Sequence, residues 1–290
     1  MAPTPTTKAP SAPHRKPNAP KSATQDTGSL ALDANPGQIP SDPVPVAARN
    51  PLSAISFVST EFAYNGSRVL GPVDLEVENG ETVVLLGESG SGKTTALRLI
   101  NTLLVPSAGS IKVLGRTTAQ WEPVSLRRSI GYMIQDVGLF PHFTVARNVG
   151  LVPQLLGWDR LRVDARVAEL LELLRLDASL ADRLPHELSG GQRQRVGVAR
   201  ALAADPSILL CDEPFGALDP LTRSRLQSEF RELTTALGKT VVFVTHDVRE
   251  ALRLGDRIVV LDAGRVRFDG LSDDFHTTTD KLVVALREHG

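Results

Sequence analysis

The spacing of hydrophobic residues changes about midway through this chain. In the first half, short apolar or alternating runs predict strands at 55–62, 73–77, 82–86, 110–114 and 130–134. Further along, apolar side chains recur at helical intervals in 144–155 and 161–174, as on helices with one buried face. Strand-like runs return at 208–212 and 241–245. We therefore predict an α/β fold whose sheet is interrupted by an all-helical insert at about 136–187.

A glycine-rich segment joins the predicted strand at 82–86 to a helix. Its residues are Gly87, Glu88, Ser89, Gly90, Ser91, Gly92, Lys93, Thr94 and Thr95. This order fits the phosphate-loop pattern, in which glycines let backbone N–H groups face an anion at a helix N-terminus. Lys93 would reach the β- and γ-phosphates of a nucleotide, and the Thr94 hydroxyl would bind Mg²⁺. The alternative is an ordinary glycine-rich turn with a solvated lysine.

Two carboxylates end the apolar run at 208–212. Asp212 and Glu213 are expected at the carboxyl edge of a buried strand, where open α/β sheets bind their ligands. Acids at such an edge are costly unless a cation lies close. We expect Asp212 to hold Mg²⁺ through water, and Glu213 to polarise the water that attacks the γ-phosphate. An acid that caps the turn before Pro214 is the alternative, and Cys211 is interpreted as a core residue.

A third motif follows the helical insert and consists of Leu188, Ser189, Gly190, Gly191 and Gln192. Ser189 and Gln192 have the spacing of a capping box, which predicts a helix that begins near Gly190. Arg193 and Arg195 in its first turn oppose the helix dipole, which favours acids there. We interpret this first turn as a place to which an anion is brought. A glycine-initiated helix with exposed arginines is the alternative.

These three motifs, in this order, resemble the ATP-binding cassette (ABC) ATPases over about residues 53–270. Other elements follow in family order, namely Tyr64, Gln135, Asp219 and His246. The resemblance implies a P-loop NTPase of ABC type, with a mixed RecA-like sheet, an N-terminal antiparallel β subdomain and an inserted α-helical lobe. We therefore expect an ABC ATPase domain at 53–290, with the lobe at about 136–187.

The resemblance also implies that ATP binds between two cassettes, with the phosphate loop of one facing the 188–192 run of the other. Ser189 and Gly191 would bind the γ-phosphate across the dimer, flanked by Gly190 and Gln192, and Asp219 would link the two sites. One chain would therefore carry two half-sites.

Within one half-site, Tyr64 would stack on adenine and Gln135 would contact Mg²⁺ and the attacking water. His246 would bridge Glu213 and the γ-phosphate, as a neutral ring that donates one proton. A hairpin aromatic is the alternative for Tyr64, and a capping or structurally satisfied histidine is the alternative for His246.

Helix caps are predicted around the later motifs. Asp247, with Glu250 three residues on, is expected to cap a helix that follows His246. Asp219 is expected to cap another, with proline at its first position. The buried face of that helix is predicted to consist of Leu221, Leu226, Phe230, Leu233 and Leu237.

The first 50 residues differ in composition from the rest. They hold half of the 20 prolines, much Ala, Ser and Thr, and few large apolar side chains. Such a segment cannot bury enough apolar surface to fold, so we predict a disordered tail at 1–50. The basic residues Lys8, Arg15, Lys16 and Lys21 all come before Asp26, the first acidic residue of the chain. A secretory signal is excluded because no apolar core follows those charges, and a transit peptide or basic tether is the alternative to a solvated tail.

Composition limits the partners. The 290 residues are 41% hydrophobic and carry a net charge of −1, which offers no bulk electrostatic argument for nucleic acid. The single cysteine excludes an internal disulfide. No apolar stretch approaches the roughly 20 residues that span a bilayer, so transport would use separate permease subunits. We expect an ATPase at the cytoplasmic face of the membrane, dimeric with a second ABC ATPase chain and served by an extracytoplasmic binding protein.

The segments 134–142, 148–158 and 215–223 resemble the ATPases of osmoprotectant importers, which take up glycine betaine, choline, carnitine or proline. The family's permeases dock on the helical lobe, so Phe140 and His142 are candidate contacts, with lobe packing as the alternative for His142 and Trp158. Longer members carry paired cystathionine-β-synthase-type domains after the cassette, which this chain is too short to hold, and the family pattern lacks the proline-rich tail.

Four other functions remain as alternatives. They are an importer of another small polar solute, an exporter, a soluble cassette acting on ribosomes or DNA, and a cassette that binds ATP without hydrolysis.

Overall fold

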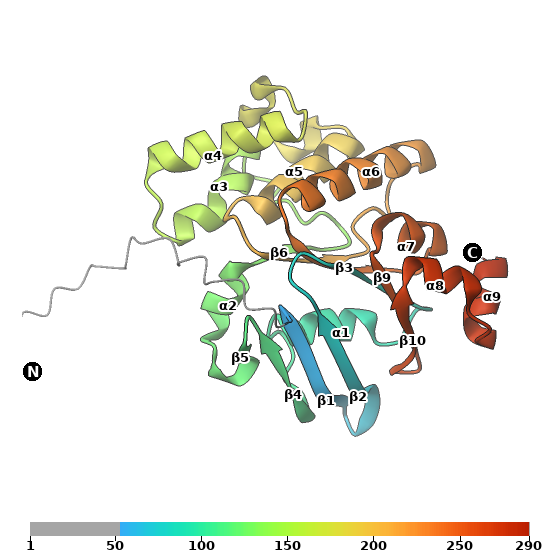
Figure 1. The fold of residues 1–290 in the computed structure, drawn as a ribbon. Coiled ribbons are helices and arrows are strands. Elements are labelled where there is room, and N and C mark those ends of the chain that lie inside the picture. Colours follow the sequence, from blue (N-terminus) through green and yellow to red (C-terminus); the bar gives the residue numbers. More distant parts are fainter. Residues whose placement is uncertain (1–52, 290) are drawn as a thin grey trace, which may run out of the picture. The chain divides into compact units, whose positions relative to one another are not determined.

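The computed structural model describes residues 53–289, which include two sheets and the helices around them (Figure 1). The tail predicted at 1–50 lies outside the described residues. The larger sheet has six strands in the order β10-β9-β3-β8-β7-β6. These strands are β3 (Thr82–Leu86), β6 (Ile130–Met133), β7 (Ile208–Asp212), β8 (Thr240–Thr245), β9 (Arg257–Asp262) and β10 (Arg265–Leu271). Within this sheet only β10 runs antiparallel to its neighbour, so the prediction of a mixed sheet is confirmed.

Every residue of β3, β7 and β8 is buried, because apolar layers cover both faces of the sheet. In β3, Val84 and Leu86 pack with the helical lobe, whereas Val83 and Leu85 pack with the smaller sheet and helix α1 (Lys93–Ile100). Alternate residues of β7 and β8 divide in the same way. Burial on two faces explains why these strands are continuous apolar runs rather than alternating ones.

The smaller sheet is antiparallel, as predicted, with the order β2-β1-β4-β5. Its strands are β1 (Ile55–Tyr64), β2 (Ser67–Val77), β4 (Ala108–Val113) and β5 (Arg116–Thr117). Strands β1 and β2 are longer than the sequence patterns indicated, because Ala63 and Tyr64 of β1 also pair with Arg68 and Ser67 of β2. Two short segments, η1 (Thr118–Gln120) and α2 (Pro123–Ser129), connect this sheet to β6.

The segment between β6 and helix α5 is all-helical, which confirms the predicted insert. It contains α3 (Val145–Leu155), α4 (Arg160–Leu173), η2 (Ala178–Asp182) and η3 (Pro185–Glu187), and it packs on α5 (Gly190–Leu202). Thr144 caps α3, accepting a hydrogen bond from the N–H of Arg147. Trp158 is half-buried against the lobe core, with Arg162 over its ring, which fits the packing interpretation, whereas Phe140 and His142 are exposed.

The remaining helices are α6 (Pro220–Ala236), α7 (Val248–Leu254), α8 (Ser272–Thr277) and α9 (Lys281–His289). Leu226 and Phe230 of α6 are buried, as predicted, and Leu233 is partly buried. The prediction was wrong for Leu221, which is 85% exposed, and for Leu237, which is also exposed. Both lie at the ends of the helix, whereas its buried residues, Leu226 to Thr234, lie in between.

Replacing Phe243 of β8 tests how much the apolar packing between the larger sheet and the helical lobe stabilises the fold. Its fully buried ring lies 6.0 Å from that of Phe215 and 6.3 Å from that of Phe230. We predict that Phe243→Ala lowers the free energy of unfolding by roughly 3–5 kcal/mol in urea denaturation, because a cavity replaces the ring. Leu161→Ala on the exposed side of α4 is the matched control and should stay within about 0.5 kcal/mol. Equal losses in the two variants would contradict this packing.

Candidate active site

The predicted site residues follow strands that end at one edge of the larger sheet. Leu86 of β3 is level with Thr245 of β8, and Asp212 of β7 is level with Val244. Met133 of β6 pairs with Cys211, so Gln135 leaves the sheet at the same edge and is exposed. This is the carboxyl edge, where open parallel sheets bind ligands.

The segment from Gly87 to Gly92 makes a tight turn into α1. At Gly87, where φ is 155°, a Cβ atom would lie 2.2 Å from the carbonyl oxygen of Leu261, so no side chain fits. Gly92 caps α1 with φ 103° and provides no side-chain acceptor for the first N–H groups of the helix. Those donors suit an anionic ligand. Glu88, Ser89 and Gly90 are exposed at the tip of the turn.

Lys93 is a buried cation at this turn, with 5% of its surface exposed. Its Nζ donates to the carbonyl oxygens of Gly87, at 2.8 Å, and Glu88, at 2.6 Å. Burial lowers the pKa of Lys93, while the charges of Glu213, Asp212 and Glu88 oppose that shift. Its nearest acceptors are neutral carbonyls, so a phosphate placed in the turn would stabilise the buried ammonium charge. The residues therefore fit a nucleotide polyphosphate.

Asp212 lies beside the phosphate loop and is 9% exposed. The Thr94 hydroxyl donates to its Oδ1 at 2.8 Å. Burial raises the pKa of Asp212, against the Thr94 hydrogen bond and the positive charges of Arg98 and Lys93. A hydroxyl and a carboxylate are the hard oxygen ligands that Mg²⁺ prefers. Within 53–289 no group of three or more His, Cys, Asp and Glu could hold a metal.

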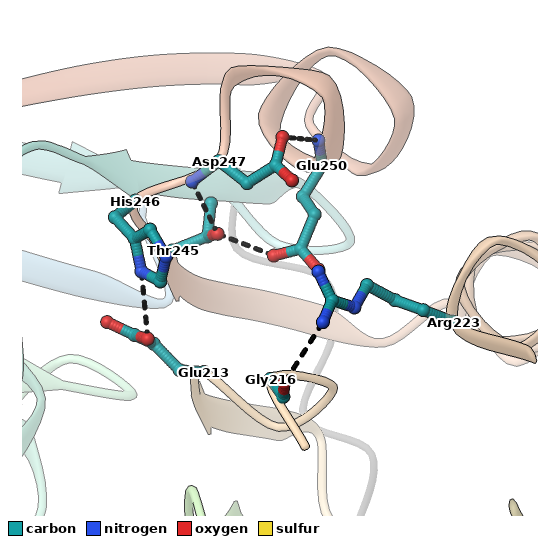
Figure 2. A pocket seen from close by; sticks show the side chains of 7 residues that line it. All are labelled: Glu213, Gly216, Arg223, Thr245, His246, Asp247 and Glu250. Carbon is teal, nitrogen blue, oxygen red and sulfur yellow. Dashed lines mark hydrogen bonds and ion pairs between the residues drawn. The ribbon is translucent and has the colours of Figure 1, made fainter. Parts of the chain in front are cut away.

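Glu213 and His246 face each other across the ends of β7 and β8 (Figure 2). The Nδ1 atom of His246 lies 2.9 Å from Oε2 of Glu213. The His246 side chain is 66% exposed, so this contact alone is too solvated to fix its own geometry. Glu213 has a left-handed backbone with φ 46°, and its N–H donates to the Val244 carbonyl. Strained non-glycine residues of this kind concentrate at functional sites.

The caps predicted around these residues are confirmed. Asp247 accepts from the N–H groups of Arg249 and Glu250 at the start of α7. Asp219 accepts from Thr222 N–H, with Pro220 at the first position of α6, and this hydrogen bond lowers the pKa of Asp219. Tyr64 lies exposed at the turn between β1 and β2, where its ring is open to solvent.

Ser189 forms the predicted capping box with Gln192 at the start of α5. The two arginines of this first turn both have partners in the chain, and the anion expected at the start of α5 stays a prediction. Arg193 donates to the Leu188 carbonyl, and Arg195 donates to the Leu174 carbonyl and pairs with Glu229.

The structure gathers the predicted residues into two groups. Cβ atoms placed at Gly190 and Gly191 would contact Leu218, at 3.7 Å, and Thr222, at 3.2 Å, so the start of α5 lies against the start of α6. Asp219 caps α6 between those two residues. Within 53–289, no hydrogen bond or ion pair joins Ser189–Gln192 to the phosphate loop. One group therefore contains the phosphate loop, Asp212, Glu213 and His246, and the other contains Ser189–Gln192 and Asp219.

Arg223, Thr245 and Glu250 line the pocket around Glu213 and His246. The sequence patterns did not predict this position for any of the three. Glu250 was interpreted only as a partner of the Asp247 cap. Its position four residues before Leu254, on the buried face of α7, was the available signal.

Comparison with known proteins decides the family. A family model described as ABC transporter matches residues 70–216. The chain belongs to the ABC transporter family. It is 51% identical over 209 residues to the glycine betaine/carnitine/choline transport ATP-binding protein OpuCA of Bacillus subtilis (strain 168), covering 72% of this chain and 55% of OpuCA. It is 49% identical over 212 residues to the glycine betaine uptake system ATP-binding protein YehX of Escherichia coli (strain K12), covering 73% and 69%. The cassette thus spans about half the length of the first of these relatives.

Solved structures agree with the expected ABC ATPase fold. The cassette MJ0796, in a structure described as a dimeric post-hydrolysis state bound to ADP and Pi, matches with a TM-score of 0.67 and 33% identity, covering 75% of this chain and 98% of that one. No helix within the described part of this cassette is both long and apolar enough to cross a bilayer.

Asp212→Asn tests whether the buried carboxylate is unfavourable for folding. Because burial raises its folded pKa, the folded chain binds more protons than the unfolded chain between the ordinary and the raised pKa. Its contribution to stability therefore falls as pH rises through that window, and the penalty is largest above it. The asparagine keeps an oxygen for Thr94 and removes the charge. We predict a higher melting temperature at neutral pH in buffer without Mg²⁺ and nucleotide.

The control is Asp164→Asn on exposed α4, which should leave the melting temperature nearly unchanged. A lower melting temperature for Asp212→Asn would show that Lys93 and Arg98 outweigh the cost of burying the carboxylate.

Proposed function

We propose that this chain is the ATP-hydrolysing subunit of an ABC importer and powers solute uptake through separate permease subunits. The observation that carries the proposal is the Glu213–His246 contact at the strand ends that also bear the phosphate loop and Asp212. A cassette that binds ATP without hydrolysing it would have no need of this pair. Its presence favours the enzyme over the regulatory alternative.

Each residue has a role in the proposed reaction. The phosphate-loop N–H groups and Lys93 bind the phosphates, and Tyr64 stacks on the adenine. Thr94, Asp212 and Gln135 hold Mg²⁺, which when bound neutralises charge on the phosphate oxygens. Glu213 orients a water and accepts its proton as the water attacks the γ-phosphate.

His246 is the residue that joins Glu213 to the phosphate. Its Nδ1 already lies on the Glu213 carboxylate, so Nε2 remains for a phosphate oxygen. In this role His246 would bridge Glu213 and the γ-phosphate.

The second group of residues is proposed to act on a partner cassette. Ser189, Gly191 and Asp219 lie together at the starts of α5 and α6, apart from the phosphate loop of their own chain. The dimeric form of the MJ0796 cassette supports a second ABC ATPase chain as the partner. The dimer, whether of identical or different chains, would lie at the cytoplasmic face of the membrane beneath two permease subunits, fed by an extracytoplasmic binding protein.

The proposed solutes are osmoprotectants, namely glycine betaine, choline, carnitine or proline. The names of OpuCA and YehX support this class. An importer of another small polar solute is the second candidate, because a cassette contacts permeases rather than solutes.

Glu213→Gln tests the role of the carboxylate. We predict that ATP binding, measured with a fluorescent ATP analogue, is kept, and that hydrolysis falls by roughly a hundredfold or more, because no base accepts the water proton. The variant should accumulate as a nucleotide-bound dimer in size-exclusion chromatography. Glu232→Gln, at an exposed position of α6, is the control and should hydrolyse ATP normally. Normal hydrolysis by Glu213→Gln would show that Glu213 is not the general base.

The transport proposal is tested in liposomes that contain the chain with the permease and binding protein encoded beside it. Glycine betaine, choline, carnitine and proline are added in turn, and phosphate release is measured. We predict that at least one of these solutes stimulates hydrolysis, and that Lys93→Ala abolishes the response. Hydrolysis that depends on Lys93 and ignores all four solutes would keep the ATPase and reject the osmoprotectant class.

A further inference from the structure

One short segment, 213–219, joins the two groups of site residues. It begins at Glu213, which faces His246, and ends at Asp219, which caps α6 beside Gly190 and Gly191. Inside it, the N–H of Gly216 donates to the Glu213 carbonyl, and the N–H of Leu218 donates to the Phe215 carbonyl. The position of this segment therefore sets the position of both groups.

Arg223, in the first turn of α6, clamps the middle of this segment. Its Nη2 donates to the carbonyl oxygens of Gly216 and Leu218, each at 3.0 Å. Hydrogen bonds from a charged donor are stronger than neutral ones. Its Nε is buried and has no hydrogen-bond partner among residues 53–289. A buried donor atom without a partner is unfavourable unless an acceptor or a negative charge lies close.

Glu250 supports the other side of the site. It is 7% exposed and accepts hydrogen bonds from the Gln227 amide, at 2.5 Å, and from the Thr245 hydroxyl. The same Thr245 hydroxyl accepts from the N–H of Asp247 at 3.0 Å. Thr245 and Asp247 flank His246, so Glu250 fixes the backbone on both sides of that histidine (Figure 2).

Arg223 and Glu250 meet in the same pocket, where the guanidinium points toward the carboxylate (Figure 2). Arg223 and Gln227 are four residues apart on α6, so both lie on the helix face from which Gln227 donates to Glu250. Burial raises the pKa of Glu250, and the positive charge of Arg223 opposes that shift. The charge of Arg223 thus reduces the cost of burying the Glu250 carboxylate.

We propose that Arg223 and Glu250 are positioning residues that hold the Glu213–His246 pair and the Ser189/Asp219 group in one arrangement. Arg223 fixes the 213–219 segment, Glu250 fixes the His246 backbone, and Gln227 and the facing charges connect the two. Neither residue touches the phosphate loop in the described chain, so they act on turnover and not on nucleotide binding. This inference rests on the proposed function.

The test compares Arg223→Gln, Glu250→Gln and the double variant in the full assembly with permease subunits. Glu250→Gln leaves one oxygen acceptor where the carboxylate has two, so the amide of Gln227 or the Thr245 hydroxyl would lose its acceptor. We expect kcat for ATP to fall roughly tenfold to a hundredfold, as for a small misplacement of catalytic groups. KM for ATP should stay within about twofold, and the double variant should be no slower than the slower single variant.

Arg225→Gln, on the exposed side of the same helix, is the control and should match the unaltered chain. A purely structural role predicts a lower melting temperature with unchanged kcat per folded molecule, and that result would overturn the inference, as would additive losses in the double variant. If a glutamine variant fails to fold, Arg223→Lys is measured instead. Lysine keeps the charge but lacks the planar fork that reaches two carbonyls, so a normal kcat would show that the contacts of Arg223 to Gly216 and Leu218 do not position the site. Absence of hydrolysis by the unaltered chain would instead reject the proposed function.

Discussion

Burial of the three central strands on both faces is the constraint on which the rest of this structure depends. Because helical lobe residues cover one face and α1 with the antiparallel sheet covers the other, β3, β7 and β8 have no side chain free for chemistry along their length. Polar function is confined to the strand ends. Parallel pairing then sets those ends side by side, so residues more than a hundred positions apart in the sequence, such as Thr94 and Asp212, come within hydrogen-bonding distance.

The rigid sheet also supports an arrangement that is unfavourable locally. Lys93 and Asp212 are buried charges whose pKa values burial shifts toward the neutral forms, and Glu213 has a strained backbone. Such features persist only where the surrounding structure over-determines them. A polyphosphate with a divalent cation would add opposite charges beside both groups. The strain and the buried charge thus mark the place where a ligand is expected.

Local sequence patterns were sufficient to predict the buried strands and the helix caps. Continuous apolar runs predicted the buried strands, and the Ser189, Asp219 and Asp247 caps depend only on residues within three positions. Signals failed where long-range packing decides the outcome. Leu221 matches the apolar face of α6, yet it lies beyond the buried part of that helix. Arg195 pairs with Glu229, and Glu250 accepts from Gln227, contacts that no local spacing indicates. The roles of Tyr64 and Gln135 rest on resemblance alone, since both side chains are exposed.

We propose that each chain carries two half-sites, each completed by a partner chain. Lys93→Ala damages the phosphate-loop half-site, and Ser189→Arg damages the other. Each variant alone should be inactive in the assembled transporter. A dimer that contains one chain of each kind has one site in which both halves are intact. ATP hydrolysis is therefore measured with transporters assembled from a mixture of the two variants. We expect the mixture to regain activity, whereas a mixture as inactive as its components would show that the two half-sites do not complete each other.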